Sequence, residues 1–156
     1  IALNAGVAKG TLYYHFKSKE EIFNYIISDG MKFITDEIEK AASKETMYLA
    51  KLKVLCKVEL NLVYEKRDFF KVILSQLWGK EVRQLELRDA VSEYVRYIEN
   101  YIKKAIEEGS IRNGKTSLMA YNFFGTLCSA AAYELINEEI AGTDEIIEYI
   151  FNGISK

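Results

Sequence analysis

Apolar residues recur every three or four positions through most of this 156-residue chain, and this spacing constrains the chain to fold into helices. The clearest example lies between residues 80 and 108, where a single apolar stripe keeps its phase throughout. The stripe consists of Val91, Tyr94, Val95, Ile98, Tyr101, Ile102 and Ala105. The chain contains no proline, 49% of its residues are hydrophobic, and alternation at period two never persists. The sequence therefore predicts an all-α fold.

Helix start and stop signals separate these stripes from one another. Ser18, followed three residues later by Glu21, predicts a capping box that begins a helix, and the polar stretch 43–45 ends that helix. Gly79 and Gly109 each follow an apolar stripe at the position where a helix is expected to end. The expected helices cover residues 18–42, 46–66, 67–78, 80–108, 115–139 and 143–155.

The first sixteen residues have the pattern of the second half of a helix-turn-helix motif. Ile1, Ala2 and Ala5 form a small apolar face at helical spacing, and Gly6 permits the tight turn that follows. The outer face of the next short helix has no carboxylate. It carries Lys9, Thr11, Tyr13, Tyr14 and His15. Hydrogen-bond donors and aromatic rings of this kind contact phosphates and base edges, so the sequence predicts a DNA-reading head.

The unbroken order of Ala5–Val7, Gly10–Phe16 and Lys17–Glu21 resembles the hallmark of the tetracycline-repressor (TetR) family of transcriptional regulators. The close resemblance covers residues 1–23, and a weaker echo lies at residues 108–112. The resemblance implies double-stranded operator DNA as a partner. The positions that match the DNA contacts of the family are Lys9, Gly10, Thr11, Tyr13, Tyr14, His15 and Lys19.

Two domains are expected. A helix-turn-helix needs a first helix behind its reading helix, and none precedes Ile1, so we expect the head to be incomplete. Residues 1–28 then form this DNA-binding domain, and residues 29–156 form a ligand-binding and dimerisation domain. Residues 1–19 hold three lysines and no acidic side chain, whereas the remaining residues hold 18 basic and 23 acidic side chains. A basic head on an acidic body confines the attraction for phosphate to one end.

Several classes of function are not expected. His15 is the single histidine of the chain and belongs to the DNA-facing set, which leaves none for nucleophilic or zinc chemistry. Tyr13 and Lys17 have the spacing of the short-chain dehydrogenase pair, but no glycine-rich dinucleotide turn accompanies them. We therefore expect no catalytic residue, metal or cofactor. Cys56 and Cys128 are isolated, and no apolar run approaches the ~20 residues of a bilayer span, so we expect a cytoplasmic protein with no membrane partner.

The body is expected to hold a small-molecule effector, because the family resembled here binds ligands there. Glu59 shares a helix face with apolar residues, and such burial is costly unless the carboxylate is paired. Glu59 is therefore either an anchor for a cationic or hydrogen-bond-donating ligand or half of an internal ion pair. Several aromatic residues either line a cavity or form plain core. The candidate pocket residues are Leu52, Cys56, Glu59, Val63, Trp78, Tyr94, Tyr97, Tyr101 and Phe124.

The segment 118–136 is apolar nearly all round, with small residues on one flank. A helix without a solvent face must be covered on both sides, and small residues allow a second helix to approach closely. We interpret this segment as half of a four-helix homodimer interface completed by the last helix; the alternative is a central core helix of a monomer. The candidate interface residues are Leu118, Asn122, Gly125, Ser129, Ala132, Ile136, Ile147, Ile150, Phe151 and Ile154.

Together these features predict a homodimeric, ligand-responsive transcriptional regulator, and specifically a repressor that a small molecule releases from its operator. Two heads on successive major grooves require half-sites roughly 34–36 Å apart, so a ligand that changes their separation would weaken DNA binding. Two alternatives remain open. One is a helical module that binds a small molecule or a protein without acting on DNA, and the other is a helical enzyme.

Overall fold

The computed structural model describes residues 14–137 and 142–152, and within these ranges it contains helices and no β-strand. The helices are α2 (Lys19–Ala42), α3 (Tyr48–Glu65), α4 (Arg67–Gln76), α5 (Val82–Glu107), α6 (Thr116–Asn137) and α7 (Thr143–Asn152). This confirms the all-α prediction. The proposed boundary between residues 28 and 29 lies inside the continuous helix α2, so the two expected domains would share this helix.

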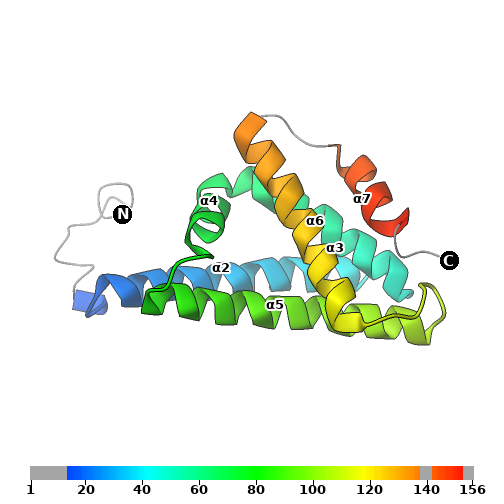
Figure 1. The fold of residues 1–156 in the computed structure, drawn as a ribbon, viewed down its shortest axis with the longest axis horizontal. Coiled ribbons are helices and arrows are strands. Elements are labelled where there is room, and N and C mark those ends of the chain that lie inside the picture. The colour runs from blue at the N-terminus through cyan, green and yellow to red at the C-terminus, as the bar shows by residue number, and fades with distance from the viewer. Residues whose placement is uncertain (1–13, 138–141, 153–156) are drawn as a thin grey trace.

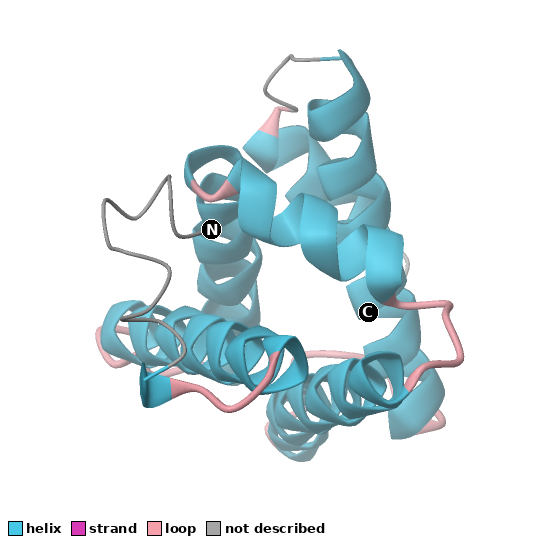
Figure 2. Cartoon of the chain, turned by 90° about the vertical axis from the view of Figure 1, so that its left-hand side faces the viewer, coloured by secondary structure: helices cyan, strands magenta, loops and turns pink. Residues whose placement is uncertain are grey.

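The two longest helices, α2 and α5, run side by side along one edge of the molecule, and α4, α6 and α7 lie toward the opposite edge (Figures 1 and 2). Helix α3 contacts each of the other five described helices and forms the centre of the packing. Its buried residues explain this position, because Leu52, Leu55 and Leu60 point in different directions around its axis and are all inaccessible to solvent. A helix that is apolar on more than one side must be surrounded.

Helix α2 begins at the predicted cap. The Ser18 side chain accepts a hydrogen bond from the backbone N–H of Glu21 at 3.1 Å. The reciprocal half of the expected capping box is shifted by one residue, because the Glu21 carboxylate accepts the N–H of Lys17 at 2.5 Å rather than that of Ser18. The start of the helix that follows the DNA-reading segment is thus fixed by two hydrogen bonds.

Helix α3 is capped by a residue far away in the sequence. Its N-cap residue, Met47, makes no side-chain capping bond, and the carboxylate of Glu108 instead accepts the backbone N–H groups of Tyr48 at 3.0 Å and Leu49 at 3.1 Å. Gly109, with a φ of 76°, follows Glu108 and turns the chain sharply at the end of α5. The weak family echo at residues 108–112 therefore has a structural role.

Replacing Glu108 with alanine is expected to lower the free energy of unfolding by about 1 kcal/mol, because two donors at the start of α3 lose their acceptor. Burial raises the pKa of Glu108, but its hydrogen bonds from Tyr48, Ser110 and Leu49 outweigh burial and leave the pKa below the ordinary value. The stabilisation is therefore present above the pKa of the unfolded chain and is lost as pH falls through the lowered folded-state pKa. Urea unfolding at pH 7 and in mild acid measures both effects.

Glu107→Ala is the matched control, because Glu107 is exposed one position earlier and carries the same charge. A loss of stability equal in the two variants would show that overall charge, and not the cap, is responsible.

Candidate functional site

The structure describes only the end of the DNA-reading segment. Tyr14 is 85% exposed, His15 and Lys19 are also exposed, and the rings of Tyr14 and His15 meet edge to face with centroids 5.2 Å apart. Lys9, Gly10, Thr11 and Tyr13 lie outside the described residues, as does Ile154 at the other end of the chain. The assignment of DNA contacts stays a prediction for all seven positions, which are Lys9, Gly10, Thr11, Tyr13, Tyr14, His15 and Lys19.

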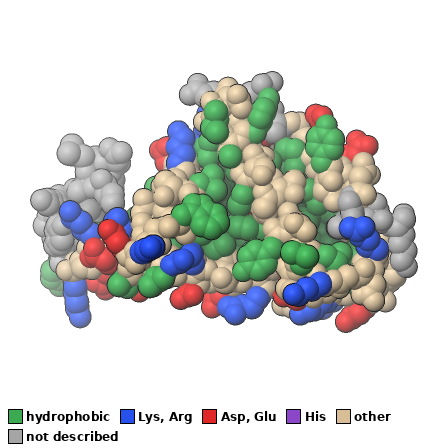
Figure 3. All heavy atoms as spheres, viewed as in Figure 1, with side chains coloured by type: hydrophobic (Ala, Val, Ile, Leu, Met, Phe, Trp, Pro, Cys, Tyr) green, Lys and Arg blue, Asp and Glu red, His purple; other side chains and the backbone are tan. Residues whose placement is uncertain are grey.

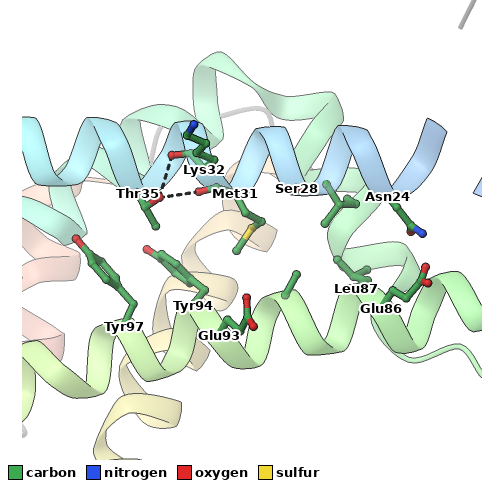
Figure 4. A pocket seen from close by; sticks show the side chains of 12 residues that line it. Asn24, Ser28, Met31, Lys32, Thr35, Glu86, Leu87, Glu93, Tyr94 and Tyr97 are labelled. Carbon is green, nitrogen blue, oxygen red and sulfur yellow. Dashed lines mark hydrogen bonds between the residues drawn. The ribbon is translucent and has the colours of Figure 1, made fainter. Parts of the chain in front are cut away.

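An open groove of about 530 Å³ runs between α2 and α5 (Figure 4). Met31 of α2 faces Tyr94 and Tyr97 of α5 across it, and Thr35 turns its hydroxyl to the carbonyls of Met31 at 3.2 Å and Lys32 at 2.9 Å. The groove combines apolar residues with a polar rim. It is lined by Asn24, Ile27, Ser28, Met31, Lys32, Thr35, Glu86, Leu87, Ala90, Glu93, Tyr94 and Tyr97.

Glu39 joins α2 to α5 at the end of the groove where Tyr97 lies. One oxygen of its carboxylate accepts hydrogen bonds from the hydroxyls of Tyr97 at 2.7 Å and Tyr101 at 2.9 Å. Burial, and hydrogen bonding to Glu39, raise the pKa of Tyr101 to about 12, so this hydroxyl remains a donor at neutral pH. Tyr101 is therefore a buried link between two helices rather than a wall of the groove.

A smaller cavity lies deeper, between α2, α3, α4, α5 and α6. Its volume is about 30 Å³, which is room for a water molecule. Met31 and Tyr94 line both the groove and this cavity, so they form the boundary between the two. The cavity is lined by Met31, Ile34, Glu59, Phe70, Ile73, Leu74, Val91, Tyr94, Phe124, Leu127, Cys128 and Ala131.

Glu59 supplies the carboxyl group among the residues that line this cavity, and the residue is only 5% exposed. It accepts a hydrogen bond of 2.5 Å from the Tyr94 hydroxyl, and the described part of the chain places no lysine, arginine or histidine within ion-pair distance of it. The internal ion pair considered above is therefore not the arrangement found here. Burial raises the pKa of Glu59 to about 7, although the Tyr94 hydrogen bond opposes this. Burial, and then the charge of Glu59, raise the pKa of the Cys56 and Cys128 thiols to about 12.

The expected pocket residues fall into three groups. Glu59, Tyr94 and Phe124 meet at the cavity, and Tyr97 lines the groove. Leu52, Cys56, Val63 and Tyr101 belong to the hydrophobic core. The prediction for Trp78 is wrong, because α4 ends at Gln76 and the turn that follows leaves the indole 84% exposed.

The sequence interpretation missed the contributions of α2 and α4 to the cavity. Helix α2 supplies Met31 and Ile34, and α4 supplies Phe70, Ile73 and Leu74. These residues repeat at helical spacing and were indistinguishable from core, since their position at a cavity depends on which helices face them.

The expected small flank of α6 is exposed in the single chain. Leu118, Asn122, Ser129 and Ile136 are exposed, the last at 78%, and a Cβ placed on Gly125 would meet nothing within 4 Å. Hydrophobic side chains gather over the α6 region on this face, with charged side chains mostly toward its margins (Figure 3). The alternative of a helix covered on all sides within one chain is therefore wrong.

The contribution expected from α7 needs correction. Ile150 and Phe151 are buried within the chain, Ile147 is half-buried, and Phe151 packs edge to face on Phe123 at 6.0 Å. Helix α7 turns its apolar side to α3 and α6, so these residues are already covered without a partner. Ala132 of α6 is also half-buried.

Among residues 14–137 and 142–152, none of the helices has the length and apolar character of a membrane span. The same residues contain no group of three or more side chains suited to a metal ion.

The helical body follows the predicted DNA-reading segment directly and has a groove along the connecting helix, an arrangement that suits a ligand-responsive transcriptional regulator. The family model of the bacterial regulatory proteins, tetR family, matches residues 1–26. A solved structure of a Clostridium perfringens protein proposed as a fatty acid metabolism regulator is 44% identical, with a TM-score of 0.87, over 99% of this chain and 86% of that one. The chain belongs to the tetR family of bacterial regulatory proteins, which confirms the resemblance inferred from its first residues.

Two further matches, a sequence and a solved structure, come from Bacillus subtilis. The fatty acid metabolism regulator protein of strain 168 is 27% identical over 99% of this chain and 82% of its own length. The structure of the transcriptional regulator FadR in complex with stearoyl-CoA is 21% identical, with a TM-score of 0.84, over 97% of this chain and 85% of that one, and it shares the fold. The predicted function class, a ligand-responsive transcriptional regulator, is confirmed by these relatives.

Proposed function

We propose that this protein is a repressor released from its operator by a long-chain fatty acyl thioester. The relatives support the effector class. The names of the Clostridium perfringens protein and the Bacillus subtilis sequence refer to fatty acid metabolism, and a Bacillus subtilis regulator was solved with stearoyl-CoA. The mixed lining of the groove suits a ligand with one apolar and one polar part, because the groove presents apolar and polar side chains in one site.

The observation that carries the proposal is the position of the groove along α2. The same helix begins at the Ser18 cap directly after the DNA-reading segment, so a ligand in the groove contacts the element that connects the head to the body. The volume of about 530 Å³ falls within the roughly 300–1,000 Å³ of common ligand sites. The deeper cavity of about 30 Å³ is too small for an acyl chain, so binding would favour a more open body.

The active form would be a homodimer, with α6 of a second copy against α6 of the first. The exposed apolar residues of α6 and the open space at Gly125 support this arrangement, and a second copy explains both features. Because Ile150 and Phe151 are buried in their own chain, we assign the main contact to α6 and only the edge to α7. The head would bind DNA through the seven positions given above, with Tyr14, His15 and Lys19 available at the start of α2.

An operator-release titration tests the effector class. The protein is bound to a fluorescent duplex selected from random DNA, and anisotropy is followed as stearoyl-CoA is added. We expect release by stearoyl-CoA and palmitoyl-CoA, because a ligand that prefers the open body shifts the population away from the DNA-binding state. Coenzyme A without an acyl chain is the matched control and should leave the complex intact. Release by coenzyme A alone, or no release by any acyl thioester, would overturn the proposal.

A further inference from the structure

We propose that the Tyr94 hydroxyl and the Glu59 carboxyl form the hydrogen-bonding site for the carbonyl group of the effector, at the boundary between the groove and the buried cavity. The inference rests on the proposed function and names the atom of the effector that this pair would recognise. It assigns the acyl tail to the cavity side and the polar remainder to the groove.

The position of the pair is the first support. Tyr94 lines both the groove and the cavity, and Glu59 lines the cavity alone. On the groove side the walls carry polar side chains such as Asn24, Ser28 and Thr35, whereas the cavity walls are apolar apart from this pair and Cys128. In an acyl thioester the carbonyl marks the same change, because an alkyl chain lies on one side of it and the polar carrier on the other.

The second support is the hydrogen-bonding capacity that Tyr94 and Glu59 leave unused. Tyr94 donates its single proton to one oxygen of Glu59. A protonated carboxyl has one further O–H to donate, and the described residues show no acceptor for it from Glu59. A carbonyl oxygen has lone pairs and no proton, so it fits a neutral carboxyl and repels an ionised one. A carbonyl group beside the pair would therefore accept the remaining hydrogen bond of the Glu59 carboxyl.

The surroundings of Glu59 favour its neutral form. The titratable groups near it are Cys56 on its own helix, Tyr94 and Tyr97 on α5 and Cys128 on α6, and none of these carries a positive charge. The residues that α2 and α4 turn to the cavity are apolar. Burial raises the pKa of Glu59 to about 7, so the proton that the carbonyl needs is present below that pH and is lost above it.

The decisive comparison uses two ligands that differ only in the carbonyl group, palmitoyl-CoA and its thioether analogue S-hexadecyl-CoA. Isothermal titration calorimetry at pH 6 should show that wild-type protein binds palmitoyl-CoA about tenfold more tightly, the ratio expected for one hydrogen bond in a buried site. The preference should fall as pH rises through about 7, because the ionised carboxylate cannot donate. Equal affinities for the two ligands at pH 6 would overturn the inference.

Three variants separate the pair from the rest of the cavity. Glu59→Leu should bind both ligands alike, whereas Glu59→Gln, whose amide always donates, should keep the preference and lose its pH dependence. Glu65→Leu makes the same change at an exposed carboxylate of α3 that lines neither the groove nor the cavity, and it should behave as wild type. A preference retained by Glu59→Leu would overturn the inference.

If wild-type protein binds neither ligand, the proposed function is wrong, whereas equal binding of both ligands contradicts only the inference. Because the comparison of two ligands is made on wild-type protein, the inference stays testable even if a variant does not fold.

Discussion

Replacing Gly125 with leucine is expected to convert the proposed dimer into a folded monomer. In the single chain a Cβ at this position meets nothing within 4 Å and the position is exposed, so we expect the substitution to leave the fold of each chain intact. Across a close contact between two α6 helices the same side chain has no room, and overpacking costs about 1–3 kcal/mol at each of the two copies. Sedimentation equilibrium at micromolar concentrations measures the change in oligomeric state, and circular dichroism checks that the helices remain.

Asn100→Leu is the control for this experiment, because Asn100 is exposed in the middle of α5 and gains the same side chain on another face. It should remain a dimer. Ala132→Arg, also in α6, should act like Gly125→Leu, since an arginine at a symmetric contact has no partner for its charge. A wild-type monomer at tens of micromolar would contradict the dimer, and a dimeric Gly125→Leu would place the contact on another helix.

Replacing Gly30 with alanine is expected to destabilise the protein by about 1–3 kcal/mol, although alanine is the better helix former. Gly30 lies in the middle of α2, and a Cβ there would overlap the ring of Phe69 from α4. The ring is half-buried and stacks edge to face on Phe70, so it must move together with its neighbour. Thermal and urea unfolding measure the loss.

The same substitution should change sign when the ring is removed. In a Phe69→Ala background, Gly30→Ala no longer meets the ring and should stabilise the protein by about 0.5–1 kcal/mol through helix propensity. The double-mutant cycle thereby separates the contact from the intrinsic cost of glycine in a helix. A stabilising Gly30→Ala in wild type would show that α2 and α4 are not held together at this point.

The helices were predictable because their signals are local. The apolar stripe of α5, the Ser18 cap of α2 and the turn at Gly109 each depend on residues within a few positions of one another. The cap of α3 was not predictable, because its acceptor, Glu108, lies about 60 residues away in the sequence. Even the capping box at Ser18 differed by one residue, since the Glu21 carboxylate can reach two adjacent N–H groups.

The candidate site was predictable only in part, for a related reason. Helical phase showed that Glu59 lies among apolar residues, but it could not show that Tyr94 on another helix supplies its hydrogen bond. Phase could also not separate Trp78, which the end of α4 leaves in solvent, from aromatic residues that face inward. Ile150 and Phe151 were assigned to a partner although α3 and α6 of the same chain cover them. Which surface meets which is a tertiary property.

The carboxylate of Glu39 holds α2 to α5 near one end, and its consequence is mechanical. From Glu39 back to the start of α2 at Lys19 the helix extends about 30 Å, at ~1.5 Å per residue. If the held end acts as a pivot, a tilt of only about 5° moves the start of α2 by roughly 3 Å over this length. A ligand in the groove lies closer to Glu39 than the start of α2 does. A small widening of the groove therefore becomes a larger displacement at the start of α2, next to the DNA-binding segment.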